Sequence, residues 1–319
     1  MKNTSMVTEF LLSGFSGPWK LRLLQASIFM LMYLSALMAN SPIITVTSLD
    51  PCFHTPVYLF LRNLSLSDLC LISAVVPKSV VNSLTQNNSI ALLSCATQVF
   101  LVVFSAAAET FLLTAMFFDR YAAIGHPLHY EVIMNRNTCV QMAAVSWLNG
   151  GFMSLLHTVI TFSLSYCGLN EIQQFFCDIP QLLAVSCSDH MTAEIVLIFI
   201  NVALDLCCFT GLIISYIYIF STIRNIPSTQ GQTKAYSTCL PYLTVVALFL
   251  STAFTAYLKP ILGSTSFTDL ILSAFYILLP PFFNPVIYSL RNKAMKTCLE
   301  KLITRKLLKE EKILTFIQE

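Results

Sequence analysis

The 319-residue sequence has few charged residues, and this shortage excludes most soluble folds. Asp, Glu, Lys and Arg make up 11% of the chain, against about 25% in typical soluble domains. Apolar residues make up 56%, and the mean hydropathy is +0.72. So little polar surface cannot cover a soluble globule. A net charge of only +2, with no basic patch, also disfavours nucleic-acid binding.

The sequence also lacks the motifs that mark many enzymes. Its five histidines have no metal-ligand spacing, and neither a glycine-rich phosphate loop nor a nucleophile-elbow pattern is present. No internal repeat or polar stripe is evident, which disfavours the alternative of a membrane transporter or channel. We therefore expect no enzymatic activity and no cofactor beyond a bound ion.

The apolar residues fall into seven segments, each long enough to span a bilayer as a helix. Four carry no charge and three carry a few. The segments are Leu23–Leu49, Val57–Leu84, Cys95–Tyr121, Asn137–Asn170, Ala193–Ile223, Ala235–Leu258 and Leu270–Leu290. A soluble protein does not bury seven such helices in a row. The sequence predicts an all-α membrane protein, a seven-transmembrane helix bundle.

Basic residues indicate how the bundle is oriented. With an extracellular N-terminus, 13 of the 18 Lys and Arg residues lie on the cytoplasmic side, although Lys20 and Arg22 oppose this orientation. Asn3 begins a glycosylation sequon, which is useful only in the lumen. We expect an extracellular N-terminus (residues 1–22) without a cleavable signal peptide, a receptor domain (23–291) and a cytoplasmic tail (292–319).

Three acidic residues lie inside predicted spans, where charge indicates function by default. Asp68 and Glu109 could lie side by side, and two such carboxylates repel unless they share a proton or a cation. A sodium site and a hydrogen-bonded pair that joins helices are equally good interpretations. Asp205 is expected to be a buried, protonated acid that packs between helices.

Asp119-Arg120-Tyr121 closes the third span, where it could serve only as an interface anchor. No acidic residue occurs between Asp205 and Asp269, so the sixth span cannot hold Arg120 by a salt bridge, and Asp119 is its nearest acidic partner.

Four cysteines fall at the predicted extracellular ends of spans, where disulfides persist. They are Cys95, Cys167, Cys177 and Cys187, and their spacing allows three pairings.

The stretch Met116–Tyr130 resembles the long motif that ends the third helix of olfactory receptors, a family of rhodopsin-like G-protein-coupled receptors. Further matches follow in the family's order: Thr55–Leu61, Cys167–Asn170, Phe175–Asp178, Ser215–Ile219, Lys234–Cys239 and Pro281–Asn292. Together they cover roughly residues 5–300, and the ordered set is very specific.

The resemblance implies roles for individual residues. Disulfides would join Cys95 to Cys177 and Cys167 to Cys187. Arg120, Tyr216 and Tyr288 would rearrange on activation and open a cytoplasmic cleft for a heterotrimeric G protein. The other residues of the coupling and activation set would be Asp119, Tyr121, Asn284 and Pro285. Pro285 would kink the seventh helix because proline removes one backbone hydrogen bond. Residues 292–302 could form a short amphipathic helix on the inner leaflet.

The expected ligand pocket is apolar. Val102 lies 18 residues before Arg120, roughly 27 Å along a helix and near the outer third of the bilayer. Receptors for cationic amines carry an acid at the matching position, which Val102 cannot replace. The candidate lining residues are Val102, Val103, Ala106, Ala107, Ile200, Leu204, Ala253, Phe254 and Tyr257. Ordinary helix packing explains the same pattern, but a pocket with such an apolar wall favours a small, neutral, mostly apolar guest.

The sequence therefore predicts a multi-pass plasma-membrane receptor that binds small volatile odorants and activates a stimulatory G protein to raise cAMP. Several family motifs are altered: Phe117-Phe118 replaces the usual Ala-Tyr, and Gly125 replaces a usual cysteine. These departures leave open a poorly functional receptor, or a chemosensory receptor of the same fold outside olfaction.

Overall fold

The computed structural model describes residues 8–13, 18–49, 55–85, 87–166, 170–187, 191–224, 228–230, 232–233 and 267–291. Five helices in these ranges are long and apolar enough to cross a membrane. They are α1 (Trp19–Leu49), α2 (Pro56–Thr85), α3 (Leu92–Gly125), α5 (Arg136–Phe162) and α7 (Thr192–Arg224). α9 (Phe267–Arg291) contains a shorter apolar stretch.

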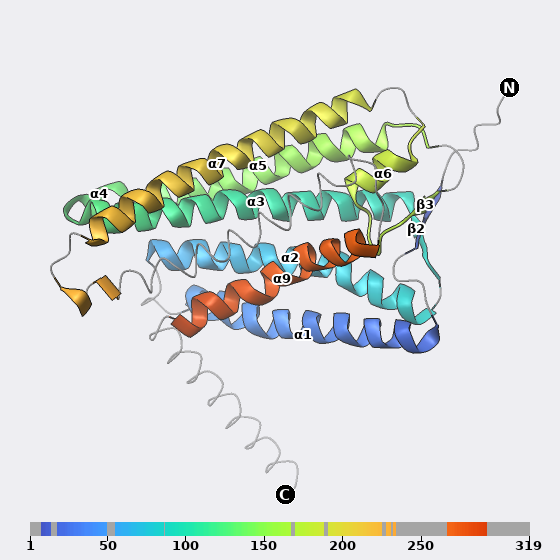
Figure 1. Cartoon of the computed structure of the whole chain (residues 1–319), viewed down its shortest axis with the longest axis horizontal. Coiled ribbons are helices and arrows are strands. Elements are labelled where there is room, and N and C mark those ends of the chain that lie inside the picture. Colours follow the sequence, from blue (N-terminus) through green and yellow to red (C-terminus); the bar gives the residue numbers. More distant parts are fainter. Residues whose placement is uncertain are drawn as a thin grey trace, which may run out of the picture.

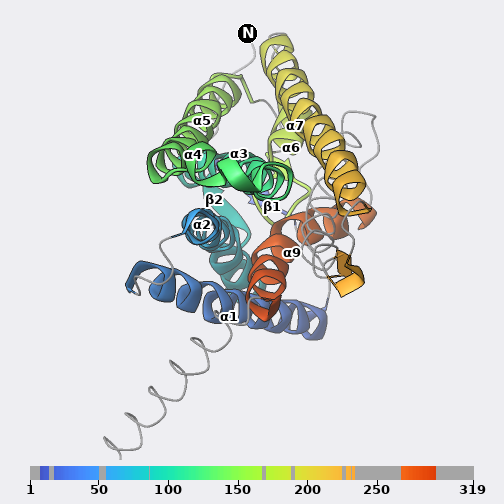
Figure 2. The ribbon, with the colours of Figure 1, turned by 90° about the vertical axis from the view of Figure 1, so that its left-hand side faces the viewer.

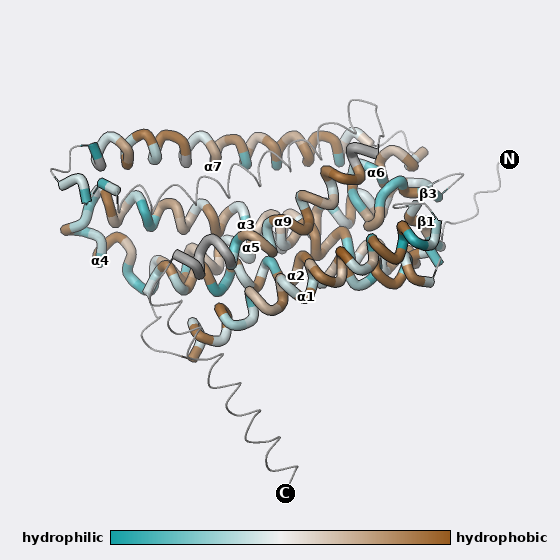
Figure 3. The backbone as a smooth tube through the Cα atoms, turned by 60° about the horizontal axis from the view of Figure 1, so that its bottom comes forward, coloured by the Kyte–Doolittle hydropathy of each residue, from teal (hydrophilic) through white to brown (hydrophobic). Residues whose placement is uncertain are grey.

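Six predicted spans thus correspond to helices (Figures 1 and 3). The predicted sixth span, 235–258, and the predicted amphipathic helix after residue 291 lie outside the described residues.

Local sequence explains where several of these helices begin. α1 starts at Trp19, earlier than the uncharged run, because Pro18 precedes it and the Pro18 carbonyl accepts from the backbone N–H groups of Leu21 and Arg22. α5 starts after Asn135, whose side-chain oxygen accepts from the Thr138 backbone N–H at 2.9 Å. Such a cap satisfies one of the free N–H groups of a helix start.

α3 occupies the centre of the bundle. Seen from the α4 end, it lies between α5, α2 and α7, and α1 lies on the outside (Figure 2). Its contact with α5 is close because Gly150 has no side chain. A Cβ atom built there would lie 2.8 Å from the Phe104 carbonyl oxygen and 3.2 Å from the Ala108 Cβ. Small residues at such crossings let two backbones approach.

Short elements close the two ends of the bundle. At one end, a 3₁₀ turn η2 (Pro127–His129) and α4 (Tyr130–Ile133) link α3 to α5. At the other end, α6 (Ile179–Val185) lies in the long connection between α5 and α7. These ends correspond to the left and right of Figure 1.

A small sheet covers the α6 end. Its strands are β1 (Glu9–Leu12), β2 (Ser89–Ala91) and β3 (Glu171–Ile172), in the order β2-β1-β3. β1 runs antiparallel to β2 and parallel to β3. Phe10 and Leu12 are buried, and the Phe10 ring meets Tyr166 edge-on at 5.0 Å between centroids. The residues before the first helix therefore form part of the folded end.

Candidate functional site

The α4 end of α3 carries a charged pair held by a tyrosine. The Arg120 guanidinium lies 3.5 Å from one carboxylate oxygen of Asp119, and the Tyr130 hydroxyl donates to the other at 2.7 Å. Asp119 is 1% exposed. Burial and the neighbouring Asp119 carboxylate raise the pKa of Tyr130, so this tyrosine stays a hydrogen-bond donor. The predicted Asp119–Arg120 pair is present, and Tyr130 on α4 joins it.

Aromatic residues of α7 pack against the same part of α3. The buried Tyr216 ring lies 4.6 Å from Phe117, and Tyr121 lies 5.2 Å from Tyr218. A Cβ at Gly125 would lie 3.0 Å from the Tyr218 ring, so the glycine that departs from the family motif fits this tyrosine closely. α7 can move here only if this aromatic contact rearranges.

A buried polar centre joins α2, α3 and α9. The Asn284 side-chain amide donates to Asp68 at 3.0 Å and to Glu109 at 2.9 Å. All three side chains are 1% exposed or less. The prediction that Asp68 and Glu109 lie close together agrees with this arrangement, and Asn284 is the residue that bridges them. Asp205 is only partly buried, on α7.

In α9, a side chain of α1 supplies the hydrogen bond that Pro285 cannot form. Pro285 has no N–H to offer the carbonyl of Pro281, four residues earlier. The Asn40 side chain of α1 donates to that carbonyl at 2.9 Å. Asn40 thus ties α1 to α9 at the proline. Tyr288 lies in α9, but its side chain is outside the described residues.

The predicted pocket residues separate into buried and exposed groups. Val102 and Val103 of α3 are buried, whereas Ile200 and Leu204 of α7 are 47% and 40% exposed. Ala106 and Ala107 are half-buried, and Ala253, Phe254 and Tyr257 lie outside the described residues.

Two residues that the sequence reasoning missed face α3 from α7. Ile198 is buried in the same apolar cluster as Val103, and Val202 packs against that cluster. The two residues are four apart and share one helix face. A helix that is apolar on every side gives no signal of which face points inward.

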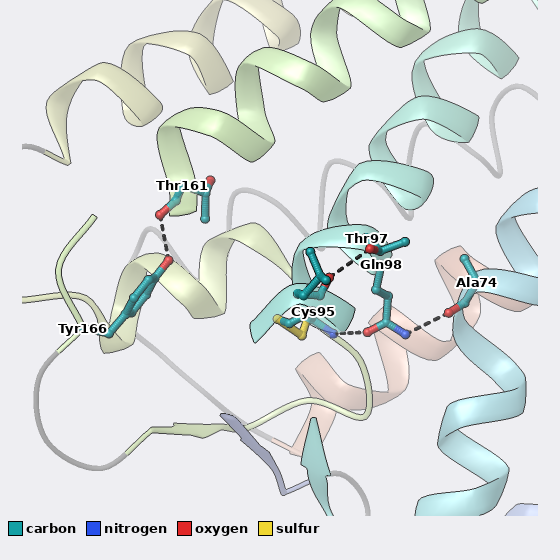
Figure 4. Close-up of a disulfide and its surroundings, with 8 residues drawn as sticks. Ala74, Cys95, Thr97, Gln98, Thr161 and Tyr166 are labelled. Atoms are coloured by element: carbon teal, nitrogen blue, oxygen red, sulfur yellow. Dashed lines mark hydrogen bonds between the residues drawn. A yellow bond between two sulfur atoms is a disulfide. The ribbon is translucent and has the colours of Figure 1, made fainter. Parts of the chain in front are cut away.

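A disulfide fixes the first turn of α3, at the α6 end of the bundle, to the long connection after α5. Cys95 and Cys177 are bonded, as the resemblance implies. Gln98, one turn along α3, accepts from the Cys177 backbone N–H at 2.8 Å and donates to the Ala74 carbonyl of α2 at 2.9 Å (Figure 4). Cys187 is also disulfide-bonded, and its predicted partner Cys167 lies outside the described residues.

The sequence reasoning also missed a polar cluster between α5 and α7. His157 contacts the Glu194 carboxylate through Nδ1 and the Asn201 amide through Nε2. His157 is 3% exposed, and Glu194 is fully buried. Two signals in the sequence were available. Glu194 lies in the first turn of α7, where a helix N-terminus favours negative charge, and His157 lies inside a predicted span. This cluster joins the two helices at the disulfide-bearing end.

Long apolar helices, a long loop tied by a disulfide to one end of α3 and an acid–arginine pair at its opposite end are together the architecture of a seven-helix G-protein-coupled receptor. A family model described as Olfactory receptor matches residues 29–306. The chain belongs to the olfactory receptor family.

Relatives from Homo sapiens match almost end to end. Olfactory receptor 14A16 is 60% identical over 310 residues, which cover 97% of this chain and 100% of the relative. Olfactory receptor 14A2 is 51% identical over 305 residues, which cover 96% of this chain and 97% of the relative. Olfactory receptor 14L1 is 48% identical over 299 residues, which cover 94% of this chain and 92% of the relative. The chain is therefore an odorant receptor and a multi-pass membrane protein, and it is not an enzyme.

Proposed function

We propose that the receptor binds small, neutral, mostly apolar odorants at the outer half of α3. The observation that carries this proposal is the apolar cluster that Val103 forms with Ile198 and Val202 of α7. Val102, on the same stretch of α3, has no charge with which to hold an ammonium group. Ala106 and Ala107 would extend the lining by one turn, and Ala253, Phe254 and Tyr257 would complete it from the sixth span. A mostly apolar wall with few polar groups is typical of small-molecule sites.

The proposed output is a stimulatory G protein that raises cAMP. Asp119 holds Arg120 and Tyr130 together in the described state. An odorant that binds better to a second state, in which Arg120 is released, would shift the population toward it. When Arg120 is released, Tyr216 and Tyr288 would rearrange as well. Tyr216 would then leave its contact with Phe117.

The experiment is a cAMP reporter assay in cells that express the receptor, with a panel of neutral volatile compounds. Arg120→Ala should abolish the response while surface labelling persists. Arg22→Ala, at the opposite end of the bundle, is the charge-matched control and should respond normally. A full response from Arg120→Ala would refute the mechanism, and responses confined to charged amines would refute the ligand class.

We also propose a plasma-membrane location with an extracellular N-terminus. The positive-inside count and the Asn3 sequon support it. Glycosidase treatment should shift the mass of the native chain and not that of Asn3→Gln. Two results together would refute this orientation: no mass shift of the native chain, and an N-terminal tag that antibodies reach only in permeabilised cells.

The polar centre is a proposed sodium site. Glu109 Oε2, Asn284 Oδ1 and Ser105 Oγ are buried without a hydrogen-bond partner among the described residues, so oxygen atoms are available beside two carboxylates. Asp68 and Glu109 would hold the ion and Asn284 would complete the oxygen set, and a bound cation would remove the repulsion between the carboxylates. The donors are carboxylate, amide and hydroxyl oxygens, which suit a hard cation such as sodium better than a transition metal that prefers nitrogen or sulfur ligands.

Thermal unfolding in sodium chloride and in choline chloride tests the sodium site. The native receptor should be more stable in sodium, and Asp68→Asn should lose that difference. Equal unfolding midpoints for the native chain in both salts would refute the proposal.

A further inference from the structure

A cavity of about 270 Å³ lies at the α4 end of the bundle, on the side away from α7 and α9. Its walls come from the end of α1, the start of α2 and the start of α5. The lining residues are Thr47, Thr55, Pro56, Leu59, Arg62, Met134, Arg136, Cys139 and Val140. It is separate from the odorant region, which lies near the opposite end of α3.

Two arginines give this cavity its charge. Arg62 on α2 is half-buried, and Arg136 in the first turn of α5 is exposed. Neither forms an ion pair with a described carboxylate, whereas Arg120 nearby is paired with Asp119. Arg136 also lies at a helix N-terminus, where the backbone N–H groups favour an anion. Arg62 and Arg136 therefore give the cavity two positive charges without a described counter-charge, and an anionic ligand would neutralise them.

Apart from Thr47 and Thr55, the rest of the lining is apolar, and part of it is on the outside of the bundle. Leu59 and Met134 line the cavity, and Val140, one turn along α5 from Arg136, is 49% exposed. In a membrane-spanning bundle an exposed valine at this level faces lipid chains. The ligand must therefore carry a negative charge at the helix ends and hydrocarbon alongside α5.

We propose that this cavity binds the headgroup of an anionic phospholipid of the cytoplasmic leaflet. The phosphate would lie between Arg62 and Arg136, with one acyl chain along Val140. This proposal rests on the orientation given under Proposed function, since anionic lipids are concentrated in the cytoplasmic leaflet. Basic pockets between helices on that side are known to suit such headgroups.

The test is native mass spectrometry of the purified full-length receptor, titrated with dioleoylphosphatidylserine or dioleoylphosphatidylcholine in the absence of odorant and G protein. Phosphatidylserine should bind in preference to phosphatidylcholine. The double variant Arg62→Gln/Arg136→Gln should lose about tenfold to thirtyfold in phosphatidylserine affinity, as expected for two basic contacts at a membrane surface. Arg224→Gln, at the same end of α7 but outside the cavity, should bind as the native chain does.

Three results would overturn the proposal: equal binding of the two lipids, equal losses in the double variant and Arg224→Gln, or native-like binding by the double variant. Glycerophosphate is titrated in parallel, and its competition at equal concentration would be a fourth such result, because the ligand would then be a free anion. The double variant must unfold at the native temperature for its loss to count. Its single-arginine variants provide the same comparison if it does not fold. Because no signalling is measured, a failed odorant response leaves this test intact.

Discussion

Replacing Gly150 by alanine should force α3 and α5 apart. The new methyl group would lie 2.8 Å from the Phe104 carbonyl oxygen and 3.3 Å from the Ala108 backbone nitrogen, so it meets main chain that cannot rotate away. Overpacking of this kind costs about 1–3 kcal/mol, and the higher helix propensity of alanine offsets about 1 kcal/mol of it. Relative to a glycine-to-alanine change without overpacking, the ratio of folded to unfolded receptor should fall roughly 5- to 150-fold. The measurement is thermal unfolding of the detergent-solubilised receptor, with surface labelling in cells as a second readout.

Gly151→Ala is the matched control. Its Cβ would lie 3.8 Å from the Phe104 ring, an ordinary contact, and alanine favours a helix over glycine by about 1 kcal/mol. The control should therefore be as stable as the native receptor or slightly more so. Equal unfolding temperatures for Gly150→Ala and Gly151→Ala would refute the close approach of α5 to the α3 backbone.

Two further predictions concern the ends of the bundle. Tyr130→Phe removes the 2.7 Å hydrogen bond to Asp119, a contact of about 1.5–3 kcal/mol. The variant should raise the ligand-free cAMP level several-fold at equal surface expression. An unchanged basal level would contradict the role of Tyr130 in holding the Asp119–Arg120 pair. At the other end, burial raises the pKa of Asp178 to about 7 from 3.8, although the Ile179 backbone N–H lowers it in part. The folded state therefore binds this proton more tightly than the unfolded chain, and Asp178 costs stability increasingly as the pH rises from about 4 to about 7. Asp178→Asn should unfold at a higher temperature than the native receptor above pH 7, with the difference shrinking toward pH 4; a constant difference would contradict it.

Uninterrupted apolar runs carry most of the information about this fold. The spans were predictable because charges are scarce inside them and polar residues separate them, and α2, α3 and α7 match the predicted ranges to within a few residues. Interior charges such as Asp68 and Glu109 were informative for the same reason, since burial of a charge needs a partner.

Contacts between distant segments were not predictable. β1 is only four residues long, and its partners lie about 80 and 160 residues away, so no local pattern indicates it. The spacing of four cysteines allowed three pairings, and only the resemblance favoured Cys95 with Cys177. The role of Asn284 required knowing that α9 packs beside α2 and α3. In each case the information is in tertiary geometry.

The sheet also sets an order for the maturation of the receptor. β1 is its central strand, and it leaves the ribosome before either neighbour. Glu9–Leu12 must wait for residues 89–91, which follow two spans, and then for residues 171–172, which follow four. The last pairing therefore cannot form until α5 and the start of the connection that follows it have been made. A chain whose later spans insert wrongly therefore cannot complete the sheet, and Phe10 loses the buried position that it has against Tyr166.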